Sequence, residues 1–440
     1  MADILIRHGD VITLDPQGRV LHDADVAISG DTIVAVGQAP VDFRPQETVD
    51  AAGHIVMPGF FNAHTHSPMT LVRGYAEDLP LDRWFNERIW QVESALTAED
   101  VYWGAALAAA EMIRAGVVGF ADHYFYMDRV GEVVLQSGLR ANLAWCAFGR
   151  ESGEVGADIA AIARFVVDWQ DAGDGRIKTS LGPHSPYMCS PQFLARTAAV
   201  AARHGVGIHI HVSESAEQVA RSQAEHGMTP VELLAKNGVF DVPVLAAHGI
   251  YLTEVDREIL AARKATVVQC PTCHMKLGMG VTPVPALQKT GINVALGTDG
   301  AASNNVLDML QEARHAALMQ KLVAQDPTLL AGEAPLRLAT QNGARALGFD
   351  LSGEITVGHA ADLILLNCAA PHLRPRHDLV ANVMYAANAG DVSDVMVAGR
   401  WLMRARRLLT LDEARILAEA ERRALRLARA PQQPWLRYQV

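Results

Sequence analysis

The chain has 440 residues, of which 50% are hydrophobic, 20% charged and 6% aromatic, a composition typical of a globular protein with a sizeable apolar core. This composition excludes a disordered chain, a collagen-like repeat and a small disulfide-stapled scaffold. The 38 lysine and arginine residues against 49 aspartate and glutamate residues give a formal net charge of -11, so neither nucleic acid polymers nor anionic membranes are expected partners.

The amino-terminal segment and the cysteines both favour an intracellular protein. Residues 1–8 lack the basic region, the long apolar stretch and the cleavage site of a secretory signal. The most apolar helix candidate, residues 101–118, is interrupted by Glu111 and Arg114, so no membrane span is expected. The 5 cysteines are odd in number and scattered over the chain, as in a reducing compartment. We therefore expect a soluble, cytoplasmic protein.

Short predicted strands separated by turns occupy the first 57 residues, over 4–7, 10–14, 25–29, 33–36 and 55–57. From residue 58 short apolar runs alternate with longer stretches of helical period, a pattern that predicts βα units around a parallel sheet. Eight βα units over about 250 residues have the size of a TIM barrel. The eight strands are expected at 60–63, 117–122, 140–144, 177–181, 207–211, 244–247, 266–269 and 293–297, with helices over 98–115, 191–204 and 306–323.

β-type segments return at 361–366 and 395–402, and an amphipathic helix is expected from Leu411 to about Arg429. A short β segment cannot bury both of its faces alone, so the two ends of the chain should combine. The predicted fold is therefore α/β: a (β/α)8 TIM barrel over residues 58–352, with a small discontinuous β-sandwich domain from residues 1–57 and 353–440.

His64-Thr65-His66 directly follows the first predicted barrel strand. In an extended segment residues i and i+2 point to the same side, so both imidazoles can face one metal at the carboxyl-terminal mouth of the barrel. A single histidine on an apolar strand is more often a core residue, but several at the same end of barrel strands favour a metal site. Nitrogen and oxygen ligands favour zinc or a similar divalent ion. The later strands end in His184, His211, His248 and Asp299.

These residues belong to sequence motifs that resemble those of the amidohydrolase superfamily. The resemblance covers nearly the whole chain. The stretches are His64-Thr65-His66, His211-Val212-Ser213-Glu214, Ala246-Ala247-His248 and Leu296-Gly297-Thr298-Asp299-Gly300. The stretch over residues 353–363, where the β-type sequence resumes after the barrel, is also typical of that superfamily. The branch that deaminates aminated heterocycles resembles this sequence best, because its members carry a glutamate three residues after the histidine of the fifth strand, here Glu214.

The resemblance implies one divalent metal ion, zinc being expected first and iron or manganese being alternatives. His64, His66, His211 and Asp299 would hold the ion, with a position open for a water whose pKa is lowered. Asp299 would take the proton of this water, and His248 would orient it by a hydrogen bond. Glu214 would protonate the ring nitrogen and help the leaving ammonia, so that a keto heterocycle remains.

Within that branch, the sequence resembles the 5-methylthioadenosine/S-adenosylhomocysteine deaminases most closely. The matching stretches lie at residues 66–74, 81–84, 182–187 and 300–305. In that family the residues matching Glu93 and His184 contact the ribose and base region of a small nucleoside, and Trp84 lines the pocket. The expected substrate contacts are therefore Trp84, Glu93, His184, Glu214 and Asp299.

Two departures from the family pattern concern the substrate. The arginines that hold the carboxylate of S-adenosylhomocysteine are missing from residues 144–148 and 156–159, and Arg150 is the one nearby substitute. The usual Ser-Asn-Leu-Lys appears as Cys273-His274-Met275-Lys276, which we expect to change the pocket wall. A thioether nucleoside such as 5-methylthioadenosine needs no carboxylate clamp and fits best. Free aminopurines, pterins and aminotriazines stay open as substrates.

Other interpretations remain. A cyclic-amide hydrolase with two metals would need a carboxylated lysine on the fourth strand; Lys178 lies there, but well before its carboxyl end. A non-catalytic scaffold would be expected to have lost part of the metal set. By strand alternation His209 should face the same side as His211, as a further ligand or as the partner of one. A homo-oligomer is compatible with the sequence.

Overall fold

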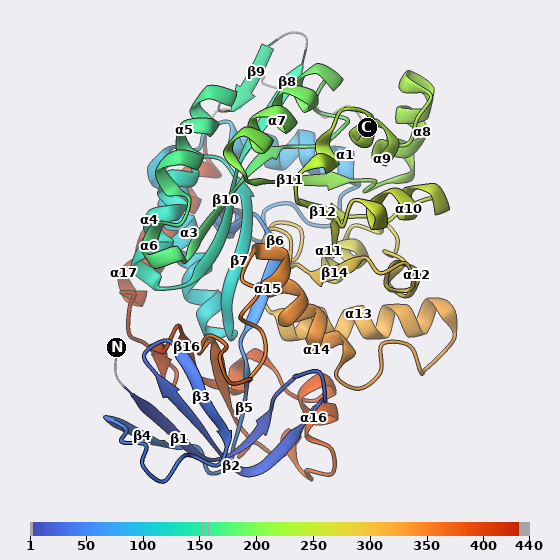
Figure 1. Ribbon diagram of the computed structural model, residues 1–440. Helices are drawn as coiled ribbons and strands as arrows, with labels where there is room; N and C mark the ends of the chain where they lie inside the picture. Colours follow the sequence, from blue (N-terminus) through green and yellow to red (C-terminus); the bar gives the residue numbers. More distant parts are fainter. Residues whose placement is uncertain (1–2, 151–152, 157, 431–440) are drawn as a thin grey trace.

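The computed structural model describes residues 3–150, 153–156 and 158–430, which form two sheets with the helices packed around one of them (Figure 1). The sheet that the helices surround is the predicted barrel. Its parallel strands follow one another in chain order, and the hairpin strand β9 (Gly153–Gly156) pairs antiparallel with β8. The strands are β6 (Phe60–Thr65), β7 (Val117–Tyr124), β8 (Arg140–Arg150), β10 (Ile177–Pro183), β11 (Gly207–Val212), β12 (Val244–His248), β13 (Thr266–Gln269) and β14 (Asn293–Leu296).

The two ends of this sheet, β6 and β14, meet at the mouth of the barrel. The Asp299 backbone N–H donates to the His64 carbonyl at 3.0 Å, and the Asn62 amide donates to the Thr298 hydroxyl at 2.7 Å. These bonds bring the first and last strands together, so the residues that follow all eight strands surround one opening. The predicted (β/α)8 barrel is confirmed.

Several helices around the barrel begin at serine or threonine caps, which accept a hydrogen bond from the first helical turn. Thr97, Ser215 and Thr253 each form a capping box with the acidic or amide residue three positions later. The helices are α3 (Ala98–Arg114), α4 (Met127–Ser137), α5 (Ile159–Trp169), the distorted turn α6 (Ala172–Gly175), α7 (Pro191–His204), α8 (Ala216–His226), α9 (Pro230–Lys236), α10 (Glu254–Ala262), α11 (Pro271–Lys276), α12 (Val284–Lys289), α13 (Met309–Ala324), α14 (Ala334–Ala339) and α15 (Gln341–Leu347).

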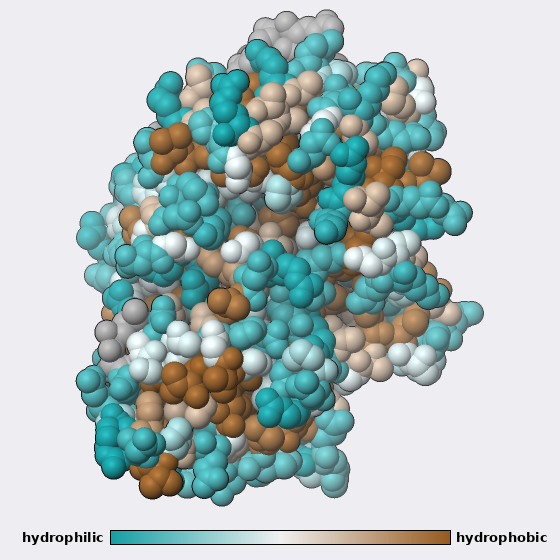
Figure 2. Space-filling model, viewed as in Figure 1, coloured by the Kyte–Doolittle hydropathy of each residue, from teal (hydrophilic) through white to brown (hydrophobic). Residues whose placement is uncertain are grey.

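The second sheet, also of nine strands, combines both ends of the chain, as the sequence predicts. β5 lies between β1 and β15, and pairs antiparallel with β15. The strands are β1 (Ile4–Ile12), β2 (Val20–Ser29), β3 (Thr32–Gly37), β4 (Glu47–Asp50), β5 (His54–Pro58), β15 (Leu363–Asn367), β16 (Val392–Val397), β17 (Arg400–Arg404) and β18 (Arg407–Leu408). Hydrophobic residues gather over this part of the molecule in Figure 2. The domain limits at residues 57 and 353 stay a prediction.

The second sheet, built from both ends of the chain, packs around its own apolar core, to which Ile6, Val26 and Leu363 belong. The turn at Gly399 meets the turn at Gly30: Gly399 has φ +70, and a Cβ atom there would lie 2.0 Å from the Gly30 carbonyl oxygen. Only glycine fits this contact, which explains why the β segment predicted at 395–402 is a hairpin of two strands instead of one.

The carboxyl-terminal helices complete the fold. α16 (Leu379–Tyr385) follows β15, and α17 (Glu413–Leu427) lies against α3, where the Arg423 guanidinium donates to the buried Asp100 carboxylate at 3.0 Å. Among the described residues, no helix combines the length and the apolar character needed to cross a membrane.

Candidate active site

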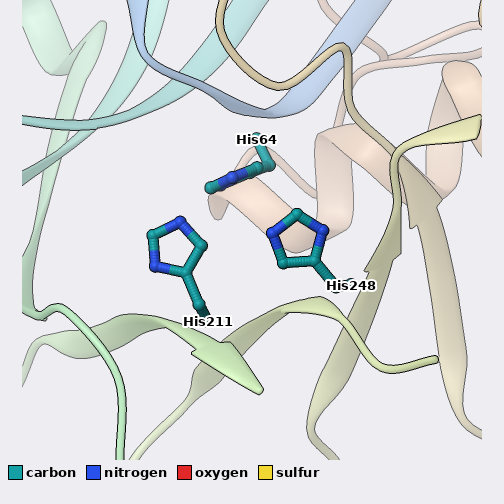
Figure 3. A group of neighbouring side chains, drawn as sticks. All are labelled: His64, His211 and His248. Atoms are coloured by element: carbon teal, nitrogen blue, oxygen red, sulfur yellow. The ribbon is translucent and has the colours of Figure 1, made fainter. Parts of the chain in front are cut away.

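The carboxyl ends of the barrel strands bring all the predicted metal ligands together. His64 lies on β6 and His66 directly after it, His211 lies on β11, and Asp299 follows β14. His248 ends β12, and its ring faces the same point as those of His64 and His211 (Figure 3). The His66 Nε2 atom lies 3.2 Å from Asp299 Oδ1 and 3.4 Å from His211 Nε2, while His64 Nε2 lies 3.6 Å from Asp299 Oδ1.

The three predicted histidine ligands, His64, His66 and His211, are each held by a contact at the ring nitrogen Nδ1. The Nδ1 atom of His64 contacts His209 Nε2 at 2.8 Å, and the Nδ1 atoms of His66 and His211 donate to the carbonyls of His123 and His184 at 2.6 and 2.8 Å. A hydrogen bond at Nδ1 fixes the ring and leaves Nε2 for a metal. His209 is thus the partner of a predicted ligand, on the side of His64 away from the cluster.

The cluster fits a divalent cation in both its donors and its charge. His64 Nε2 is buried with no hydrogen-bond partner among the described residues. Burial lowers the pKa of His64 to about 4, so its imidazole is neutral and offers a lone pair. Burial opposes ionisation of His66 as well, but the bonded Asp299 carboxylate raises the pKa of His66 to about 9. The carboxylate therefore stabilises positive charge at the centre of the cluster.

Asp299 is held in a strained backbone conformation by contacts on both carboxylate oxygens. Oδ1 accepts a hydrogen bond from the Gly300 backbone at 2.7 Å, and Oδ2 accepts one from the Cys273 thiol at 2.9 Å. The φ angle of Asp299 is 61°, and those of His248 and Ser213 are 73° and 50°. Left-handed backbone at non-glycine residues costs energy and is concentrated at functional sites.

Glu214 and His248 face each other beside the cluster. Glu214 Oε2 accepts hydrogen bonds from the Tyr187 hydroxyl at 2.6 Å and from Gln218 Nε2 at 3.3 Å. Its other oxygen, Oε1, lies 3.8 Å from His248 Nε2. Glu214 therefore has one oxygen fixed and the other directed towards the pocket, an arrangement suited to moving a proton.

One pocket is lined by His66, His211 and Asp299 of the metal cluster and by all five predicted substrate contacts. Trp84 comes from α1 (Leu81–Trp84), and Glu93 ends α2 (Trp90–Glu93), with the π-helical turn η2 (Phe85–Ile89) between them. His184 follows β10. The lining residues are His66, Met69, Leu81, Trp84, Phe85, Glu93, His123, Tyr124, Phe125, Cys146, Phe148, His184, Tyr187, His211, Glu214, His248, Leu277, Asp299 and Ser303.

Glu93 and His184 have opposite electrostatic environments. The Tyr124 hydroxyl donates to Glu93 Oε1 at 2.7 Å, but burial outweighs this bond and raises the pKa of Glu93 to about 7. The His184 ring stacks on Phe148 and on His211, with centroids 4.9 and 4.5 Å apart. Burial lowers the pKa of His184 to about 3, so its ring is neutral.

One expectation about the pocket is wrong. Cys273 and His274 do not form its wall; they lie behind it, where the Cys273 thiol contacts Asp299 and His274 Nε2 contacts His248 Nδ1 at 3.1 Å. α11 begins immediately after β13, so its first turn runs beneath the mouth of the barrel. Both side chains are almost fully buried there.

Of the two basic candidates, Arg150 and Lys178, only Lys178 can be placed. The side chain of Arg150 lies outside the described residues, and among the described residues that line the pocket none is lysine or arginine. Lys178 forms an ion pair with Asp171 away from the cluster, so the carboxylated lysine of a two-metal hydrolase has no candidate at this position.

Four polar side chains of the pocket were not among the predicted site residues: His123, Tyr124, Tyr187 and Ser303. His123 and Tyr124 end β7, and the rule that singled out the other strand ends would have found them. Tyr187 and Ser303 lie in the stretches 182–187 and 300–305 that carry the family resemblance. Their contacts depend on how the loops turn, which residue spacing does not determine.

Comparison with known proteins identifies the family. The profile of the amidohydrolase family matches residues 55–402. The 5-methylthioadenosine/S-adenosylhomocysteine deaminase of Pelotomaculum thermopropionicum is 46% identical over 430 residues, 97% of this chain and 99% of that protein. The 5'-deoxyadenosine deaminase of Methanosarcina acetivorans is 43% identical over 423 residues, 96% of this chain and 97% of that protein.

Solved structures agree with the sequence comparison. An adenosine deaminase from Xanthomonas campestris with bound zinc superposes with a TM-score of 0.92 at 38% identity, over 97% of this chain and 98% of that chain. The family match spans the barrel with both of its flanking strands, β5 and β15, and contains the whole histidine cluster. The chain belongs to the amidohydrolase family.

Proposed function

We propose that this chain is a metal-dependent hydrolytic deaminase of adenosine-type nucleosides, with 5-methylthioadenosine as the preferred substrate. The observation that carries the proposal is the convergence of His64, His66, His211 and Asp299 in one cluster, beside Glu214 and His248 at the pocket. The names of the relatives and the zinc bound to the Xanthomonas campestris structure support deamination with zinc as the metal.

His64, His66, His211 and Asp299 would hold a divalent metal, which would supply an attacking water of lowered pKa. Asp299 would take one proton of this water as its oxygen bonds to the amine-bearing carbon, and His248 Nε2 would orient it by a hydrogen bond. Glu214 would give its proton to the adjacent ring nitrogen. When the carbon–nitrogen bond breaks, the proton held by Asp299 would pass to the departing ammonia, and the remaining hydroxyl proton would return to Glu214 as the keto group forms. The Tyr187 hydroxyl holds Glu214 in place through this sequence. The products are the keto nucleoside and ammonia.

The pocket wall supports a nucleoside without a carboxylate. Glu93, held by Tyr124, can accept hydrogen bonds from ribose hydroxyls, and the neutral His184 ring lies beside it in the same pocket. The wall near β8 consists of Cys146 and Phe148, which suit a methylthio group. A carboxylate there would be desolvated without a cationic partner among the described lining residues.

Ammonia release from a substrate panel tests the proposal. The zinc-loaded chain would be offered 5-methylthioadenosine, S-adenosylhomocysteine, adenosine, guanine, a pterin and an aminotriazine, with the Glu214→Gln variant as the matched inactive control. We expect the adenosine derivatives to react, the methylthio compound ahead of the carboxylate-bearing one. Activity confined to a free base, pterin or triazine would contradict the nucleoside assignment, and no release from any compound would contradict deamination.

A cytoplasmic location is a further part of the proposal, and a homo-oligomer is compatible with it. The cysteines are all free and buried, which supports a reducing compartment. Cell fractionation and the mass of the purified protein in solution would test the two statements.

A further inference from the structure

His274 lies directly behind His248 and does not itself line the pocket. Its Nε2 atom lies 3.1 Å from His248 Nδ1. Both rings are 1% exposed. The opposite nitrogen of His248, Nε2, faces the pocket 3.8 Å from Glu214 Oε1. The two imidazoles are therefore linked in series, from the buried His274 ring through His248 to the reacting groups.

The direction of the hydrogen bond between His274 and His248 follows from the surroundings of the buried His274 ring. Burial lowers the pKa of His274 well below its usual range, so the ring is neutral and carries one N–H. Among the described residues, His274 Nδ1 has no hydrogen-bond partner. A proton on Nδ1 would be a buried donor without an acceptor, which costs the full desolvation of that group. With the proton on Nε2, His274 donates to His248 Nδ1, and only a bare ring nitrogen stays unpaired.

The position of the proton on the His248 ring then follows as well. Because its Nδ1 accepts a hydrogen bond, its own proton must lie on Nε2, the atom that faces Glu214 and the pocket. A nitrogen that carries a proton cannot bind a metal. This matters because His248, His64 and His211 offer ligand atoms within 4.8 Å of one another, so distance alone would allow His248 to be a third histidine ligand (Figure 3).

We propose that His274 is a positioning residue that holds His248 with its proton on Nε2, so that His248 donates a hydrogen bond in the active site and does not bind the metal. The inference rests on the proposed function for its kinetic consequence. The tautomer itself is a property of the folded chain.

Two substitutions of His274 test the kinetic consequence. His274→Leu removes the donor; with the zinc-loaded enzyme we expect kcat to fall at least tenfold, KM to change less than threefold and one zinc per chain to be retained. His274→Gln can place an amide N–H near the position of Nε2, so kcat should recover to within about threefold of the original protein. The matched control is His315→Leu, which removes another hydrogen-bonded histidine, from α13, outside the pocket. We expect its kcat to stay unchanged.

Nitrogen-15 NMR of histidine-labelled protein measures the tautomer independently of turnover. We expect His248, assigned by its absence from a His248→Asn spectrum, to show a protonated Nε2 in the original protein and in His274→Gln. In His274→Leu we expect this signal to move towards the Nδ1-protonated form. The spectra stay informative when no deamination is found and when His274→Leu fails to fold, so failure of the proposed function and failure of this inference can be told apart.

Three results would overturn the inference. The first is a protonated Nδ1 on His248 in the original protein. The second is an unchanged kcat in a folded His274→Leu variant. The third is a second tightly bound zinc that His274→Leu abolishes, which would assign His274 to a metal site with His248 and Cys270, whose ligand atoms also lie within 4.8 Å of one another.

Discussion

Replacing Glu93 with glutamine should stabilise the protein at alkaline pH while impairing catalysis. In the folded chain burial raises the pKa of Glu93 from 4.5 to about 7. Between these values the folded state binds the proton more tightly than the unfolded state, so the favourable contribution of Glu93 is fully present below pH 4.5 and is lost as the pH rises through 7. Above pH 7 the ionised carboxylate stays buried at a cost that glutamine avoids.

The expected size of the effect follows from the shift in pKa. A shift of about 2.5 pKa units corresponds to about 3 kcal/mol, and this is an upper limit because the Glu93 side chain is only half-buried from solvent. The stabilisation by Glu93→Gln should therefore be about 2 kcal/mol larger at pH 8 than at pH 5. The Tyr124 hydroxyl can still donate to the amide oxygen, so the hydrogen bond is retained.

Urea unfolding at pH 5 and pH 8, in the presence of a chelator so that only groups of the chain contribute, measures this difference. The matched control is Glu87→Gln, in the same segment, where the carboxylate is exposed and paired with Arg83; this variant should gain no stability at pH 8. Equal effects of Glu93→Gln on the free energy of unfolding at both pH values would refute the argument that burial of an ionised carboxylate is the cause.

The other predictions concern the reacting groups. Glu214→Gln should lower kcat by about 10²–10⁴-fold with zinc content unchanged by elemental analysis, and retained turnover would remove Glu214 as the proton donor. Cys273→Ser should keep kcat within about tenfold because a hydroxyl can donate to Asp299 as the thiol does, whereas Cys273→Ala should lower it further; equal rates for both variants would show that this hydrogen bond is irrelevant. Removal of the metal with a chelator should abolish ammonia release and lower the Tm, and added zinc should restore both. A chelated protein with an unchanged Tm would contradict a metal bound to the folded state by four protein ligands.

The positions of the ligands could be predicted because they depend only on strand geometry. His64 and His66 follow from alternation along one strand, and His211, His248 and Asp299 follow because parallel strands end at the same mouth. The residues at which helices begin could be predicted less well, because they depend on local hydrogen bonds. The helix expected from residue 306 begins at Met309, because the Asp308 side chain accepts hydrogen bonds from Leu310 and Gln311 and caps it there.

The location of Cys273 and His274 could not be read from the sequence for a related reason. Both follow a barrel strand, as the ligands do, but they lie in a helical turn in which successive side chains point in different directions. The structure, and not the residue spacing, reveals that the side chains of Cys273 and His274 lie behind the active site. Strand β4 was not predicted either: its four residues alternate like many exposed loops, and its pairing with β1 depends on distant partners.

The pairing of β5 with β15 sets an order in which the protein can be completed during synthesis. β5 leads directly into β6 and its metal ligands, yet its antiparallel partner leaves the ribosome only after every strand of the barrel. Until then one edge of β5 presents unpaired backbone groups, which makes the nascent chain vulnerable to wrong pairing with other molecules. The last quarter of the chain, which contributes no residue to the pocket as far as it is described (to residue 430), therefore closes the sheet that stands beside the barrel.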